Sequence, residues 1–99
     1  MAATNPTFDD VMPDDRKEAV ISLAYPVTLA DRQLDSVTMR RPTLGDILDH
    51  EPKRVEDVKE EVILIGLLCG LKEPEMRLLD TTDYARLQKQ YVRFRAVPE

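Results

Sequence analysis

The sequence has few of the residues on which redox and metal chemistry depend. Its 99 residues contain one cysteine, Cys69, one histidine, His50, and no tryptophan. A single cysteine cannot form an intramolecular disulfide, which favours a reducing compartment. A metal site would need several further ligands around the lone histidine, so we interpret His50 as a solvent-exposed residue of a charged loop. No cofactor or metal is expected.

Sequence patterns typical of catalysis are also missing. The chain has only three glycines, and it contains no glycine-rich phosphate loop, no paired-cysteine motif and no nucleophile elbow. Cys69 lies at the apolar end of a predicted helix with no histidine near it in sequence, which favours a small core residue over a nucleophile. We therefore expect a protein that is not an enzyme.

Positive charge and long apolar runs are scarce as well. The chain has 14 basic and 19 acidic residues, with a net charge of −5 at pH 7. Because nucleic-acid binding draws its affinity from an excess of Lys and Arg, nucleic acid is not an expected partner. The longest apolar run, residues 62–71, is about half the roughly 20 residues that a bilayer span requires. A membrane partner is therefore not expected either.

Residues 1–18 differ in composition from the rest of the chain. They hold two prolines, four aspartates and no periodic apolar pattern. Such a segment cannot offset the entropy lost on ordering, so we interpret it as a disordered acidic tail that is dispensable for folding. An alternative is a short partner-binding motif built on Phe8, Val11 and Met12.

Residues 19–97 are predicted to form a single α+β domain that begins with an antiparallel hairpin over residues 20–40. The first strand has apolar residues at every second position, which indicates one buried face: Ile21, Leu23, Tyr25, Val27 and Leu29. Pro26 has no N–H for a ladder, so it must lie on an unpaired side or at a bulge. A hairpin is marginal alone, so helices must cover its apolar face.

Helices are predicted at about residues 44–50, 55–69, 74–79 and 82–95, and their boundaries carry recognisable signals. Thr43 with Asp46 predicts a reciprocal cap on the first helix. Gly70 predicts a left-handed end to the second helix. The first helix is expected to turn three apolar side chains inward: Leu44, Ile47 and Leu48.

Two surfaces are candidates for binding a partner. The second helix is apolar around its whole circumference near its end, so it is either fully wrapped or forms a groove for an amphipathic helix, lined by Ile63, Leu64, Leu67 and Leu68. The last helix has a basic face of Arg86, Lys89 and Arg93, which either complements the helix dipole or docks an acidic partner. Arg40 and Arg41 end the second strand, where one arginine pairs with an acid or grips a partner carboxylate.

Four segments together resemble a known family. They are ISLAYPVTL, RRPTLGDIL, IGLLCGL and DTTDYARLQKQYVRF, and they cover about residues 20–95. In order and spacing they are similar to the tail assembly chaperones of Mu-like and related contractile-tailed bacteriophages and prophages. The turn at Asp31-Arg32 departs from the family in lacking a glycine. The positions that carry the resemblance are structural junctions: Arg40, Arg41, Pro42, Thr43, Asp46, Gly70, Asp83 and Tyr84.

The resemblance implies a non-catalytic, transient binder of the tape measure protein, the helix-rich rod that sets tail length. Such a chaperone would act without a cofactor in the host bacterial cytoplasm, keep the rod soluble until the tail tube polymerises, and be absent from the mature virion. The chain would correspond to the short form of a pair made by ribosomal frameshifting, whose longer form is a further candidate partner. Alternatives are a structural subunit retained in the tail and a small nucleic-acid-binding regulator that uses the basic face.

Overall fold

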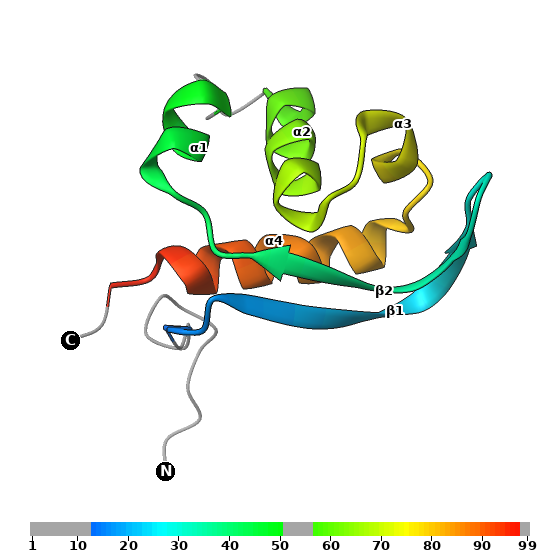
Figure 1. Ribbon diagram of the computed structural model, residues 1–99, viewed down its shortest axis with the longest axis horizontal. Coiled ribbons are helices and arrows are strands. Elements are labelled where there is room, and N and C mark those ends of the chain that lie inside the picture. The colour runs from blue at the N-terminus through cyan, green and yellow to red at the C-terminus, as the bar shows by residue number, and fades with distance from the viewer. Residues whose placement is uncertain (1–12, 51–56, 98–99) are drawn as a thin grey trace, which may run out of the picture.

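The computed structural model describes residues 13–50 and 57–97. A two-stranded antiparallel hairpin is followed by helices, which confirms the predicted α+β class (Figure 1). The described elements are β1 (Glu18–Thr28), β2 (Gln33–Arg40), α1 (Leu44–His50), α2 (Val58–Cys69), α3 (Glu73–Met76) and α4 (Thr81–Arg95). The predicted start of the second helix at residue 55 lies outside the described ranges. Helix α3 ends at Met76 rather than at 79.

The hairpin is regular except where Pro26 interrupts it. The register runs from Glu18 opposite Arg40 to Ser22 opposite Ser36, and resumes at Val27 opposite Leu34. The irregularity between Ser22 and Val27 contains the proline, as its missing N–H predicts. The bulge also breaks the alternation of side chains, so Tyr25 is 57% exposed. The prediction that Tyr25 faces the core is therefore wrong.

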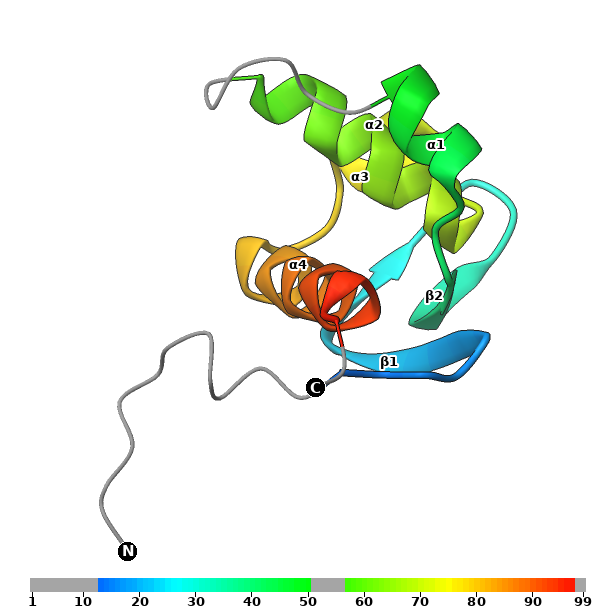
Figure 2. The ribbon, with the colours of Figure 1, turned by 90° about the vertical axis from the view of Figure 1, so that its left-hand side faces the viewer.

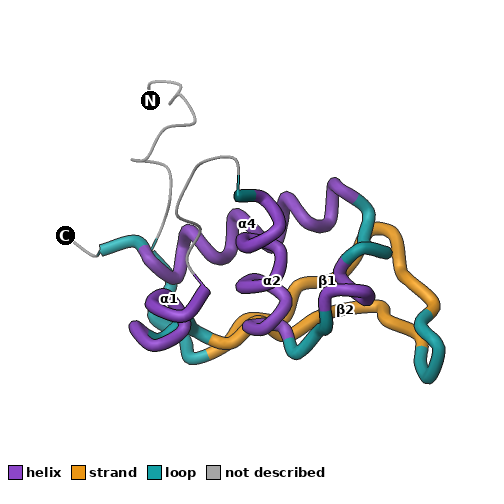
Figure 3. Tube along the Cα trace, turned by 90° about the horizontal axis from the view of Figure 1, so that it is seen from above, coloured by secondary structure: helices purple, strands orange, loops and turns teal. Residues whose placement is uncertain are grey.

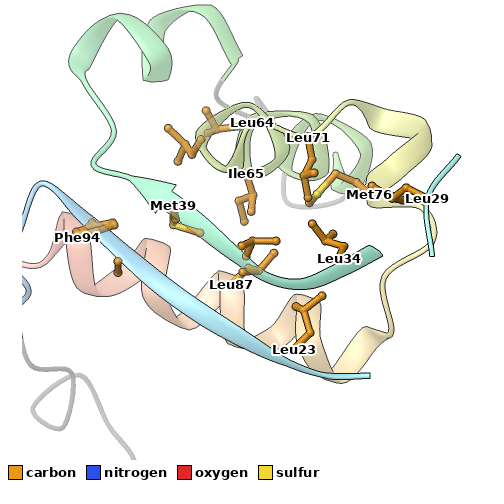
Figure 4. Packing of buried hydrophobic residues seen from close by; sticks show 13 residues of the cluster. Leu23, Leu29, Leu34, Met39, Leu64, Ile65, Leu71, Met76, Leu87 and Phe94 are labelled. Atoms are coloured by element: carbon orange, nitrogen blue, oxygen red, sulfur yellow. The ribbon is translucent and has the colours of Figure 1, made fainter. Parts of the chain in front are cut away.

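The core lies where the hairpin, α2 and α4 meet. Helix α4 runs along β1, helix α2 packs on β2, and α1 and α3 contact α2 (Figures 1 and 2). Seen from above, α2 overlaps the long helix α4, and α1 lies beside α2 (Figure 3). Four apolar side chains are almost completely buried in this core, namely Met39, Leu64, Ile65 and Leu87 (Figure 4). Each contributes about 1.5–3 kcal/mol through burial.

Helix α1 packs less than its sequence pattern predicts. Leu44 is 72% exposed and Leu48 is 76% exposed, and Ile47 is the apolar residue of α1 that packs partly on the core. A helix of seven residues can turn only a narrow stripe towards its neighbour α2. The expectation that Leu44 and Leu48 face inward is therefore wrong.

The domain extends further towards the N-terminus than the predicted boundary at residue 18. Asp14 is buried, Lys17 accepts a backbone hydrogen bond from Arg41, and β1 begins at Glu18. Residues 14–18 thus contact the rest of the domain, so its boundary lies before residue 18, and dispensability of the tail for folding stays a prediction. The remainder of the predicted tail, with Phe8, Val11 and Met12, lies outside the described residues. Within the described ranges, no helix has the length and apolarity needed to cross a membrane.

Candidate partner-binding surface

The apolar end of α2 is mostly enclosed by its own fold. Leu64 and Leu68 are 0% and 2% exposed, so these two predicted partner-binding residues belong to the core. Helix α3 covers another side of α2. A Cβ on Gly66 of α2 would lie only 2.8 Å from Cγ of Met76 in α3. Ile63 is half-buried, and Leu67 is 42% exposed. Of the four predicted groove residues, Leu67 offers the largest accessible apolar surface.

The basic face of α4 lies on the flank next to β1. Arg86 and Lys89 are exposed, and Nη1 of Arg86 donates to the carbonyl of Ser22, 3.2 Å away. Arg93 is half-buried, and its carbonyl accepts the backbone N–H of Asp14 at 3.1 Å. The first contact places Arg86 beside β1, and Lys89 and Arg93 share the same face of α4 at 3.6 residues per turn.

The opposite flank of α4 faces α2. The Tyr84 hydroxyl donates to Oε1 of Glu61 at 2.6 Å, and Nε2 of Gln88 donates to the same oxygen at 2.8 Å. Burial and this carboxylate raise the pKa of Tyr84. Leu67 lies about 120° around α2 from Glu61 at 3.6 residues per turn. The structure therefore does not bring the apolar surface of α2 and the basic face of α4 together into one groove.

The junction between β2 and α1 is held by hydrogen bonds among three residues, Arg40, Thr43 and Asp46. Nη1 and Nη2 of Arg40 donate to the two oxygens of Asp46 at 2.7 and 2.9 Å. The Asp46 carboxylate also accepts the Thr43 N–H at 2.8 Å, and Thr43 Oγ1 accepts the Asp46 N–H at 3.2 Å. The predicted reciprocal cap is confirmed, and so is the interpretation that one arginine pairs with an acid. The Arg40 guanidinium holds the pKa of Asp46 well below its usual range.

We expect Thr43→Ala to lower the free energy of unfolding by about 0.5–2 kcal/mol, because it leaves the Asp46 N–H without its acceptor. Chemical denaturation of both proteins measures the loss. Thr43→Ser keeps the hydroxyl and serves as the control, with a stability close to that of the original protein. Equal stability of the alanine and serine variants would contradict a capping role.

Arg41 joins the N-terminal segment to the end of α4. Its Nη1 donates to the carbonyls of Asp14 and, at 3.1 Å, Arg16, and its Nη2 donates to the carbonyl of Phe94 at 3.0 Å. The guanidinium carbon lies 5.3 Å from the centroid of the Phe94 ring. Arg41 thus satisfies one carbonyl at the C-terminal end of α4, that of Phe94, where cations are favoured. Pro42 follows it, half-buried, before α1.

Asp14 completes this junction, although nothing in the sequence separates it from the neighbouring acids of the predicted tail. Nη2 of Arg16 lies 2.6 Å from its Oδ2, and Nε2 of Gln90 donates to the same oxygen at 2.8 Å. The hydrogen bonds from Arg16 hold the pKa of Asp14 well below its usual range. No periodic pattern or cap marks this residue, so only the fold reveals it.

We expect the domain to lose stability below about pH 4. The folded-state pKa values of Asp14 and Asp46 lie below the unfolded value of about 3.9. Their contribution is therefore present above that pH and is lost as both carboxylates take up protons on acidification. Asp14→Asn should make the decrease in unfolding free energy between neutral and acidic pH smaller. An identical decrease in both proteins, measured by urea denaturation, would exclude Asp14 as a source.

The remaining junction residues lie at helix ends. Gly70 has φ 70°, and the Leu71 N–H donates to the Gly66 carbonyl at 2.8 Å, which confirms the predicted left-handed end of α2. Asp80 caps α4 by accepting the Thr82 N–H at 2.8 Å.

Cys69, next to Gly70, is half-buried, and burial raises its pKa to about 12. The thiol is thus protonated at neutral pH, as its interpretation as a core residue predicts.

Asp83 has a role that sequence analysis missed. Its side chain is completely buried, and its two oxygens accept the N–H groups of Ala24 and Tyr25 at 2.8 and 3.0 Å. Both N–H groups belong to the bulge of β1, where the hairpin ladder is interrupted. A carboxylate from α4 therefore replaces the missing strand partner. The sequence signal was an acid in the first turn of a predicted helix, which by itself indicates only a favourable helix dipole.

His50 does not lie in a charged loop as predicted. It is the last residue of α1 and is half-buried. Within residues 13–50 and 57–97, no three histidine, cysteine or acidic side chains gather where they could hold a metal ion.

Comparison with known proteins identifies the family. No curated protein and no solved structure matches the chain. A family model described as "Phage tail assembly chaperone proteins, E, or 41 or 14" matches residues 20–95. This match runs from β1 to the last residue of α4 and includes the hairpin, the Arg40–Asp46 junction and Asp83. The chain therefore belongs to the phage tail assembly chaperone family.

Proposed function

We propose that this chaperone binds the tape measure protein of its phage in the bacterial cytoplasm and keeps it soluble until the tail tube polymerises. The observation that carries the proposal is the family match over residues 20–95. A helix-rich rod exposes apolar stripes before the tube surrounds it, and a small acidic domain with its own apolar surface can cover them without precipitating. Binding of this kind needs no catalytic residue and no cofactor.

Exposed leucines supply a surface for such a partner. Leu44 and Leu48 lie four residues apart on α1, which places them on one face, and Leu67 is exposed on α2. These side chains contribute little to the core, so folding does not require leucine at these positions. An amphipathic helix could bury its apolar stripe against either surface.

Co-expression with the tape measure protein of the same phage tests the function. We expect the tape measure protein to be soluble with the chaperone and insoluble without it, and we expect the two to purify together. A tape measure protein that is equally soluble in both cases and does not purify with the chaperone would contradict the proposal.

Surface variants then test where the partner binds. We expect Leu44→Asp with Leu48→Asp, or Leu67→Asp, to weaken binding while thermal unfolding is nearly unchanged, since these side chains face solvent. Leu78→Asp is the matched control, because Leu78 is 56% exposed and lies beyond α3. If all these variants bind as the original protein does, the leucines of α1 and α2 are not the contact surface.

Two rival functions make different predictions. A structural subunit would be found in purified virions by mass spectrometry, whereas the chaperone should be absent from them. A nucleic-acid-binding regulator using Arg86, Lys89 and Arg93 would bind DNA or RNA with an affinity that falls as salt rises. The acidic net charge of −5 disfavours the second rival.

A further inference from the structure

We propose that the basic stripe of α4, defined as Arg86, Lys89 and Arg93, is a docking surface for residues 8–12 of the same chain. These residues, Phe-Asp-Asp-Val-Met, combine two acids with three apolar side chains. The stripe would thus take an acidic, partly apolar peptide, and the chain itself carries one. The inference is independent of the proposed tape measure partner.

The stripe has the charge and the accessibility that such a peptide needs. Arg86 and Lys89 are exposed, and in the described part of the chain neither forms a salt bridge with a carboxylate. The bond from Arg86 to Ser22 holds its side chain along β1. Val92, next to Arg93, is 45% exposed and offers an apolar contact beside the cations. Oppositely charged groups at such a surface favour association and set its orientation.

The chain enters the described domain directly beside this stripe. The backbone N–H of Asp14 donates to the Arg93 carbonyl at 3.1 Å, and Gln90 donates to the Asp14 carboxylate at 2.8 Å. At 3.6 residues per turn, Gln90 lies about 40° around α4 from Arg86 and about 60° from Arg93. Residue 13 is therefore held at the C-terminal end of the stripe.

The length of the intervening chain fits the stripe. At about 3.3 Å per residue, Asp10 and Asp9 can lie up to about 10 and 13 Å from residue 13. Along α4, Lys89 is about 6 Å and Arg86 about 10 Å from Arg93 at 1.5 Å per residue. Both acids can thus reach the cations. A tether this short gives an effective concentration in the millimolar range, so even a weak contact is populated.

Amide NMR spectra of the full-length protein test the docking. We expect Asp9→Asn with Asp10→Asn to shift the amide signals of residues 86–93, and high salt to shift the same signals in the original protein by screening the contact. The control is Asp31→Asn with Asp35→Asn, which changes the net charge equally at the hairpin turn and the start of β2. Those substitutions should leave the α4 signals in place.

Two results would overturn the proposal. One is an α4 spectrum that is unchanged in the Asp9, Asp10 double variant. The other is a difference between the α4 signals of the original protein and of the double variant that disappears on dilution. That result would show that a second copy occupies the stripe. Docking within one chain is supported if this difference persists on dilution and if the same two Asp substitutions no longer shift the α4 signals in a Lys89→Gln background.

Discussion

Leu64→Ala should lower the free energy of unfolding by about 2–5 kcal/mol, because Leu64 is completely buried and its truncation leaves a cavity in the core. Leu67→Ala, three residues further along the same helix, should lower it by only about 0.5–1 kcal/mol, since Leu67 is 42% exposed. Urea denaturation of the two variants measures the difference.

This pair of variants distinguishes the two interpretations of the apolar helix α2. If Leu64 served mainly to bind a partner, Leu64→Ala would remain as stable as Leu67→Ala. A large loss of stability at Leu64 alone would instead confirm that the helix is wrapped by the hairpin, α3 and α4. Of these two positions, only Leu67 is suitable for the tape measure assay, because an unfolded Leu64 variant loses binding for any function.

Asp83→Ala should lower the free energy of unfolding by about 3 kcal/mol, because two hydrogen bonds to a charged group are lost and two N–H groups lose their acceptors. The affected groups are the N–H of Ala24 and the N–H of Tyr25 in the bulge of β1. The stability of Asp83→Asn should fall between those of the original protein and Asp83→Ala, since asparagine keeps one acceptor oxygen. Denaturation measures the stability, and amide exchange should become faster at Ala24 and Tyr25.

Asp80→Ala is the matched control for Asp83. It removes an aspartate from the same helix end but affects only the cap, with an expected loss of about 0.5–2 kcal/mol. Amide exchange in the β1 bulge should not change in this variant. Equal losses for both aspartates, with unchanged exchange at Ala24, would mean that Asp83 acts only through the helix dipole.

The elements and several junctions of this protein could be predicted from sequence because the signals are local. Pro26 lacks an N–H and therefore marks the bulge. Thr43 and Asp46 lie three residues apart and cap each other, and Gly70 adopts the left-handed conformation that ends α2. In each case the responsible groups lie within a few residues, so the spacing alone defines the interaction.

Exposure was predicted less well, because periodicity shows which residues share a face but not which faces find a neighbour. Leu44 and Leu48 have the spacing of buried residues and yet lie in solvent, since α1 is too short to be covered. Leu64 and Leu68 matched a groove pattern and yet lie in the core.

The sequence by itself determined the family, the α+β class and the local caps, since these depend on residue types at short spacings. Only the tertiary structure decided the roles of Asp14 and Asp83, whose hydrogen-bond partners include Gln90, Ala24 and Tyr25, far away along the chain. The basic face and the accessible part of α2 were likewise separated by the packing of α4 between β1 and α2. The sequence does not show whether a carboxylate contacts water or a buried N–H. The packing of elements that are distant along the chain decides which of the two it contacts.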